Sequence, residues 1–114
     1  MRILLVLTTP PYQSIKVQEG LDLALMLAAM GHTLGLVLAE SAVWLLQPSQ
    51  HTEDSGLRNL LKLLDSLALY DIHQCYIYRP HHFFAPTVWP VLWQRLNEQA
   101  MHRLCNTQDE VLYW

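Results

Sequence analysis

Glycine is scarce in this sequence of 114 residues, and its scarcity excludes a group of functions. The only four glycines are Gly20, Gly31, Gly35 and Gly56. They are too few and too scattered to form G-x-G-x-x-G or a P-loop. Nucleotide binding through either of these motifs is therefore excluded.

Charged residues are also few, at 15% of the sequence, against roughly 25% in an average soluble domain. The net charge is −3, and Lys and Arg form no cluster anywhere in the chain. Tight binding to a phosphate backbone depends on grouped cations that release counterions. We therefore expect no direct contact with nucleic acid.

No long apolar run is present. The longest is Leu23–Met30, eight residues, whereas a helix that crosses a bilayer needs about 20. The segment Ile3–Leu7 resembles the start of a signal peptide, but it is too short, and Thr8 to Pro11 follow it without a small-residue cleavage site. It is interpreted as a buried strand, so we expect no contact with a membrane and a cytoplasmic location.

Apolar residues, in contrast, make up 52% of the chain, with four Trp and five Tyr. The length fits one domain over residues 1–114, whose modest interior cannot hide that much apolar surface. Aromatic residues concentrate in interface cores. Part of this surface is therefore expected to lie in a subunit interface, although a Trp-rich core is the simpler alternative.

The segment from Gly56 to Tyr78 indicates the fold class. Leucines over 57–68 recur at helical spacing with polar residues opposite, which predicts an amphipathic helix. A short, mostly apolar strand is predicted over Ile72–Tyr78, after a turn at Tyr70 and Asp71. A helix that leads into such a strand is half of a βαβ crossover, so a parallel sheet is expected beneath it.

The rest of the chain extends this pattern. Gly20 inside the first helix indicates close packing, and Gly31 is a natural cap for its end. Pro90 weakens the fourth strand and indicates a sheet edge. The remaining strands are predicted over Ile3–Leu7, Thr33–Ala39, Val88–Trp93 and Val111–Trp114, and the helices over Ile15–Met30, Ala42–Leu46 and Arg95–Cys105. Together these elements predict an α/β fold, a three-layer α/β/α sandwich with a mainly parallel five-stranded sheet.

Ligands of open parallel sheets bind beyond the carboxyl ends of the strands. The first such loop presents the hydroxyls of Thr8, Thr9 and Ser14 beside a helix N-terminus, a setting that favours anions. This pattern permits a small-anion or nucleotide-binding module. Ordinary turn and cap chemistry explains the same residues.

The two thiols are Cys75 and Cys105, with no C-x-x-C pair, which indicates reduced cysteines of a cytosolic protein. Cys75 is the candidate for a catalytic, sulfur-carrying cysteine, but it lies within a predicted strand with no base nearby, and a structural role is favoured. Cys105 is placed at the negative end of a helix dipole, which argues against reactivity. We therefore assign no catalytic residue.

The histidines do not predict a metal site. His81 and His82 are adjacent, an arrangement that rarely chelates one ion, and no second pair of ligands has suitable spacing. The others are single, at His32, His51, His73 and His102, and are interpreted as surface or helix-end residues. We expect no metal and no cofactor.

Several segments carry a family resemblance over nearly the whole chain. The most specific are Leu69–Cys75, which reads LYDIHQC, and Glu19–Asp22, which follows a first loop with Thr9 and Pro11. Val43–Leu46 and Asp109–Trp114 give weaker support. The chain resembles the DsrE/DsrF-like family, and within it the TusC/DsrF subunits of sulfur-relay complexes. Residues 79–90 depart most from the family pattern.

This resemblance implies a flavodoxin-related topology and a function. TusC-like subunits assemble with B-type and D-type partners of the same fold into a heterohexamer, which relays sulfur as a cysteine persulfide towards 2-thiolation of the tRNA wobble uridine. The acceptor cysteine of that complex belongs to the D-type subunit, so the resemblance carries no catalytic role to Cys75. DsrF-like subunits act instead in intracellular sulfur oxidation, which is the alternative pathway.

Overall fold

The computed structural model describes residues 1–9, 16–46, 67–80 and 93–114. Its described strands form one sheet in the order β4-β3-β2-β1-β5, and every neighbouring pair is parallel. The strands are β1 (Arg2–Leu7), β2 (Thr33–Glu40), β3 (Gln74–Pro80), β4 (Trp93–Leu96) and β5 (Glu110–Tyr113). The predicted five-stranded parallel sheet is therefore confirmed.

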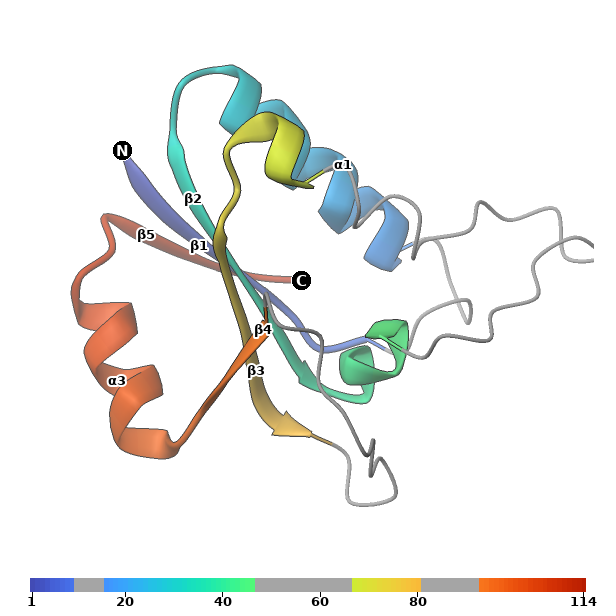
Figure 1. Ribbon diagram of the computed structural model, residues 1–114, viewed down its shortest axis with the longest axis vertical. Coiled ribbons are helices and arrows are strands. Elements are labelled where there is room, and N and C mark those ends of the chain that lie inside the picture. Colours follow the sequence, from blue (N-terminus) through green and yellow to red (C-terminus); the bar gives the residue numbers. More distant parts are fainter. Residues whose placement is uncertain (10–15, 47–66, 81–92) are drawn as a thin grey trace, which may run out of the picture.

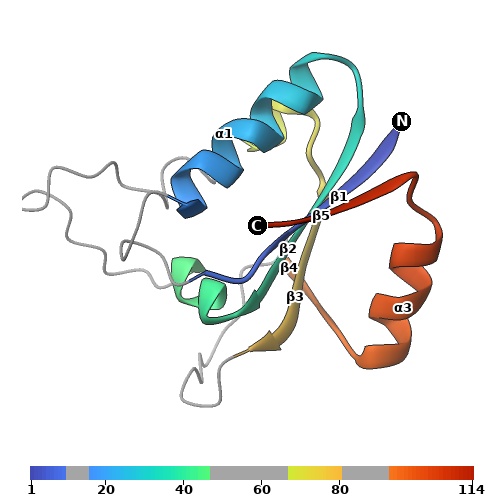
Figure 2. The same ribbon diagram turned by 180° about the vertical axis from the view of Figure 1, so that it is seen from behind.

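Helices cover both faces of this sheet (Figures 1 and 2). On one face lies α1 (Lys16–Ala29), with the short 3-10 helices η1 (Ser41–Leu46) and η2 (Leu67–Tyr70). On the other face lies α3 (Glu98–Asn106). The predicted three-layer arrangement is confirmed.

Side chains alternate along the central strands and build two separate cores. Leu5 and Leu36 point to the α1 face, whereas Val6 and Val37 point to the α3 face, and all four are buried. Both faces of β1 and β2 are covered by packed side chains. The sequences of these strands are therefore continuous apolar runs.

The chain direction explains why one face has less cover. From β1 through β4 each strand is added on the same side of its predecessor, and α3 lies in the one connection that returns across the sheet to β5. Right-handed crossovers in opposite directions lie on opposite faces. Among the described elements, α3 alone therefore packs on its face.

Helix α1 ends as the sequence predicts. Gly31 has φ +95, the His32 N–H donates to the Leu27 carbonyl at 3.2 Å, and the Gly31 N–H donates to the Ala28 carbonyl at 3.0 Å. This hydrogen-bond pair is a Schellman motif, which needs a left-handed residue after the helix. The close packing expected at Gly20 is also confirmed, because a Cβ built there would lie 2.6 Å from Leu7 Cδ2.

Strand β3 begins two residues later than predicted. The Ile72 N–H donates to the carbonyl of Leu67 at 3.0 Å, so it closes η2 and does not pair in the sheet. Asp71 has φ 60 and turns the chain between η2 and the strand. The helix predicted over 57–68 lies outside the described residues except for its last two positions, which belong to η2.

The boundary between β4 and α3 was predicted wrongly. The strand expected to end at Trp93 instead runs from Trp93 to Leu96, and the helix expected from Arg95 begins at Glu98. Asn97 sets this boundary, because its backbone is extended and its Oδ1 accepts a hydrogen bond from the Ala100 N–H at 2.7 Å. The predicted edge position of this strand is confirmed.

The closing strand lies beside β1. The Trp114 N–H donates to the Val6 carbonyl at 2.8 Å, and the Asp109 N–H donates to the Arg2 carbonyl at 2.8 Å. In the part of the chain that the structure describes, no helix combines the length and the hydropathy that a bilayer crossing requires.

Candidate functional site

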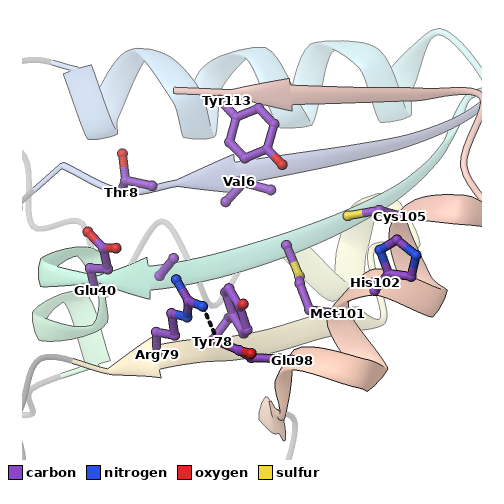
Figure 3. A pocket seen from close by; sticks show the side chains of 11 residues that line it. Val6, Thr8, Glu40, Tyr78, Arg79, Glu98, Met101, His102, Cys105 and Tyr113 are labelled. Atoms are coloured by element: carbon purple, nitrogen blue, oxygen red, sulfur yellow. Dashed lines mark hydrogen bonds and ion pairs between the residues drawn. The ribbon is translucent and has the colours of Figure 1, made fainter.

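A cavity of about 510 Å³ opens between α3 and the carboxyl ends of the central strands (Figure 3). This is the edge at which ligands of parallel sheets are expected. The cavity exists because the nine-residue α3 is the only described element on this face, and it does not cover the strand ends. Its lining residues are Val6, Thr8, Ala39, Glu40, Tyr78, Arg79, Glu98, Met101, His102, Cys105 and Tyr113.

The floor of the cavity is apolar. Val6 and Ala39 come from β1 and β2, and Met101 comes from α3; all three are buried in the core of this face. Tyr78 and Tyr113 lie on β3 and β5, with β2 and β1 between them. A ligand in this space would thus contact aliphatic side chains and two aromatic rings.

One ion pair crosses the cavity rim. The Arg79 guanidinium donates to Glu98 Oε1, which links the end of β3 to the first turn of α3 (Figure 3). The Arg79 Cζ also lies 5.2 Å from the ring centroid of Tyr78. The hydrogen bond to Glu98 raises the pKa of Arg79, and the charges of Tyr78, Glu98 and Glu40 add to this shift. The side chains of Arg79 and Glu98 are well exposed, so the pair orients the rim without contributing much to stability.

The backbone is unusual at the same rim. Glu40 has φ 54 and Arg79 has φ 47, and residues other than glycine rarely adopt such left-handed backbone conformations. Glu40 is the last residue of β2 and Arg79 the next-to-last of β3, and the β2–β3 register shifts between Ala39 and Glu40. Strained residues of this kind gather at functional sites when the surrounding structure holds them in place.

The candidate cysteine Cys75 lies on the opposite face of the sheet from this cavity. It is on β3, only 2% exposed, and packs in the core beneath α1. Burial raises the pKa of its thiol from 9.0 to about 11, so it is protonated at neutral pH. A thiol in this state is a poor nucleophile.

Cys105 is the more accessible thiol. It is half-buried, near the end of α3, and lines the cavity one helical turn from His102 (Figure 3). Its place near the C-terminal end of a helix agrees with the sequence analysis.

The hydroxyls proposed from the first loop are only partly brought to the site. Thr8 lines the cavity, and its Oγ1 donates to the Trp114 carbonyl at 3.4 Å, whereas Thr9 is not among the lining residues. Ser14 lies outside the described residues, as do His51, His81 and His82.

The described histidines lie apart from one another. His32 Nδ1 is 3.4 Å from the Met1 amino group, and His73 Nε2 is 3.8 Å from Asp71 Oδ1. His102 lies at the cavity. Within residues 1–9, 16–46, 67–80 and 93–114, no three His, Cys, Asp or Glu side chains gather to hold a metal ion.

Sequence reasoning located the correct edge of the sheet but missed most of the residues there. Glu40 and Arg79 are strand-end residues, and the loop rule could have selected them by position. Glu98, Met101 and Cys105 reach the site from a helix whose placement depends on the strand order, which no local motif encodes.

A second feature is a set of exposed apolar side chains on α1 and the neighbouring η2, which we call the α1–η2 surface. It comprises Met26, Met30, Leu69 and Tyr70, exposed by 53%, 65%, 83% and 44%. Met26 and Met30 are one helical turn apart, and η2 contacts α1, as Figures 1 and 2 both show. Large exposed apolar side chains that gather on one surface are typical of interaction sites.

Comparison with known proteins gives a family and a fold. The model of the DsrE/DsrF-like family matches residues 1–79. Over 76 residues the chain is 33% identical to Protein TusC of Escherichia coli O127:H6 and 30% identical to Protein TusC of Klebsiella pneumoniae subsp. pneumoniae. Each match covers 67% of this chain and 64% of the relative, so the chain matches less than two thirds of the length of these relatives.

The fold is shared with a solved protein. The crystal structure of the ychN protein from E. coli superposes with a TM-score of 0.78 at 18% identity, covering 100% of this chain and 99% of that one. At this level of identity the likeness concerns the fold alone. The family match covers more than half of the sequence, and the chain belongs to the DsrE/DsrF-like family.

Proposed function

We propose that this chain is a TusC-like subunit of a heteromeric sulfur-relay complex, which supports persulfide transfer towards 2-thiolation of the tRNA wobble uridine. Its partners are B-type and D-type subunits of the same fold. The observation that carries the proposal is the state of Cys75, a buried thiol with a pKa of about 11, in a chain similar to proteins named TusC.

The state of Cys75 supports a subunit that does not carry the sulfur itself. An acceptor must present a thiolate to an incoming persulfide, and Cys75 is 2% exposed in the α1 core, away from the cavity. Exposing this thiol would require the packing beneath α1 to open. We therefore propose that Cys75 does not carry the sulfur and that the reactive cysteine belongs to a partner.

The α1–η2 surface supports assembly. It places four large apolar side chains in water, which is unfavourable for an isolated chain and is relieved when a partner covers them. A partner of the same fold would pack an apolar surface of its own against it. We propose this surface as the contact with a sibling subunit.

The test is co-expression with B-type and D-type subunits from the same organism. We expect the three chains to co-purify as one complex, and Leu69→Lys with Met26→Lys to abolish co-purification. Gln99→Lys is the matched control, because Gln99 is exposed on α3, on the opposite face. A chain that stays alone with both partners present would contradict the proposal.

The role of Cys75 is tested in the same complex. The variant Cys75→Ala should assemble normally and retain 2-thiouridine formation in tRNA. Mass spectrometry of the wild-type chain, after incubation with a persulfide donor, should find no added sulfur atom on Cys75. Loss of thiolation in an intact Cys75→Ala complex would show that this chain does carry sulfur.

A further inference from the structure

The charges around the cavity under α3 do not balance. Its lining holds one permanent cation, Arg79, and two carboxylates, Glu40 and Glu98. Arg79 is already bound to Glu98 and lies over the ring of Tyr78. Glu40 takes part in no ion pair among the described residues, and in Figure 3 the dashed line joins only Arg79 and Glu98. The charge of Glu40 also acts on Arg79, whose pKa it helps to raise, but one guanidinium faces two carboxylates, so these three side chains together carry a net charge of −1.

The backbone holds this carboxylate at the cavity. Glu40 adopts φ 54, directly after the register shift that separates it from Ala39. A regular strand would have continued the alternation of β2 and sent this side chain towards the α1 face. Glu40, which is exposed, lines the cavity instead, and its left-handed backbone has a conformational cost.

Next to this carboxylate the cavity is apolar. Val6, Ala39 and Met101 form the floor, and the ring of Tyr113 lies beyond them. The volume of about 510 Å³ falls within the roughly 300–1,000 Å³ of small-molecule sites. An acidic group at one side of an apolar, aromatic space is complementary to an ammonium group on a short hydrophobic body.

We propose that this cavity binds a small organic amine, whose ammonium group donates to the Glu40 carboxylate and whose apolar body lies over Ala39 and Met101. The Arg79–Glu98 pair lies beside this position and does not favour anions, because the carboxylate of Glu98 offsets the charge of the guanidinium. This site is independent of the proposed sulfur-relay role, since it uses neither Cys75 nor the α1–η2 surface.

The test is a titration of the full chain with 2-phenylethylammonium, followed by NMR of methyl-labelled Met and Ala. The methyl signals of Met101 and Ala39 should shift saturably, and those of Met26 and Met30, on the other face, should stay in place. The neutral isostere 2-phenylethanol should bind at least about tenfold more weakly, because it lacks the charge-assisted contact.

Two variants locate the contact. Glu40→Gln keeps the shape of the side chain and should weaken ammonium binding by roughly tenfold. Glu110→Gln, a matched change of an exposed glutamate on β5 outside the cavity lining, should leave binding unchanged. Absence of a saturable shift, equal binding of amine and alcohol, or full binding by folded Glu40→Gln would each overturn the proposal. If a variant does not fold, the comparison of 2-phenylethylammonium with 2-phenylethanol on the wild-type chain still tests whether the ammonium charge contributes to binding.

Discussion

Trp114 packs directly against Gly20. A Cβ built on Gly20 would lie 2.9 Å from Trp114 Cδ1, and the Trp114 indole Nε1 donates a hydrogen bond to the Lys16 carbonyl at 2.7 Å. The indole thereby ties the first turn of α1 to the sheet edge next to β1. This contact requires a residue without a side chain at position 20.

We expect Gly20→Ala to destabilise the protein. Alanine gains about 1 kcal/mol of helix propensity over glycine, but the added methyl group would clash with Leu7 and with the rigid indole of Trp114. Overpacking of this kind costs about 1–3 kcal/mol, so a net loss of about 1 kcal/mol is expected. Urea unfolding followed by circular dichroism measures it.

A double-mutant cycle identifies the cause. In a Trp114→Ala background the loss from Gly20→Ala should shrink or reverse, since the indole no longer limits the space. An unchanged loss would assign the effect to Leu7 alone.

The raised pKa of Cys75 predicts a pH dependence of stability. Between pH 9 and 11 the unfolded chain releases the Cys75 proton while the folded chain keeps it, so the unfolded state binds fewer protons and stability falls as pH rises. The shift from 9.0 to about 11 corresponds to a loss of roughly 2–3 kcal/mol over this window. Urea unfolding at pH 8, 9, 10 and 11 measures the slope.

Tyrosines and lysines titrate in the same range, so the variant Cys75→Ala supplies the reference. Its stability should be lower at pH 8 because of the lost packing, but it should fall less steeply up to pH 11. Parallel curves for the two proteins would show that Cys75 does not cause the slope.

The two thiols should differ in reactivity. Iodoacetamide at pH 8 should alkylate Cys105, which is half-buried at the cavity, long before Cys75, which is 2% exposed. Peptide mapping by mass spectrometry measures the alkylation of both cysteines. Unfolding in urea should make the two alkylation rates similar. Faster labelling of Cys75 in the folded chain would contradict the packing described here.

The contribution of the Asn97 cap to the free energy of unfolding should also be measurable. Asn97→Ala removes the acceptor of the Ala100 N–H and should cost about 1 kcal/mol in the free energy of unfolding. Asn97→Asp keeps an acceptor at the same place and should retain stability. If both variants lose equally, the cap does not set the start of α3.

The Arg79–Glu98 pair should contribute little to stability. Its side chains are 57% and 72% exposed, and exposed pairs contribute about 0–1 kcal/mol. Glu98→Gln should therefore shift the urea midpoint only slightly, and the shift should vanish at high salt. A large, salt-independent loss would show a structural role that exposure does not indicate.

The central fold was predictable because its determinants are local. Ile3–Leu7 and Leu34–Ala39 are buried on both faces, which produces unbroken apolar runs, and Gly31 marks the end of α1 by its left-handed backbone. The edge strand was misplaced because Trp93 to Leu96 is buried only at its two ends. That spacing fits one turn of a helix as well as a strand.

The candidate site was less predictable for a different reason. Its position at the carboxyl edge follows from parallel topology, and Thr8 was found in this way. Glu40 and Arg79 become unusual only through their φ values, which depend on how β2 and β3 pair. The contribution of Cys105 depends on which face of the sheet α3 covers, a property of the whole strand order.

The position of β5 beside β1 has a consequence for synthesis of the chain. β1 is made first, yet one of its two neighbours is made last, so that side of β1 offers unpaired backbone groups while the intervening hundred or so residues emerge. A chain that ends before β5 would have a sheet with an apolar, unpaired edge at β1, which favours aggregation. Pairing of β5 with β1 therefore protects this side of β1.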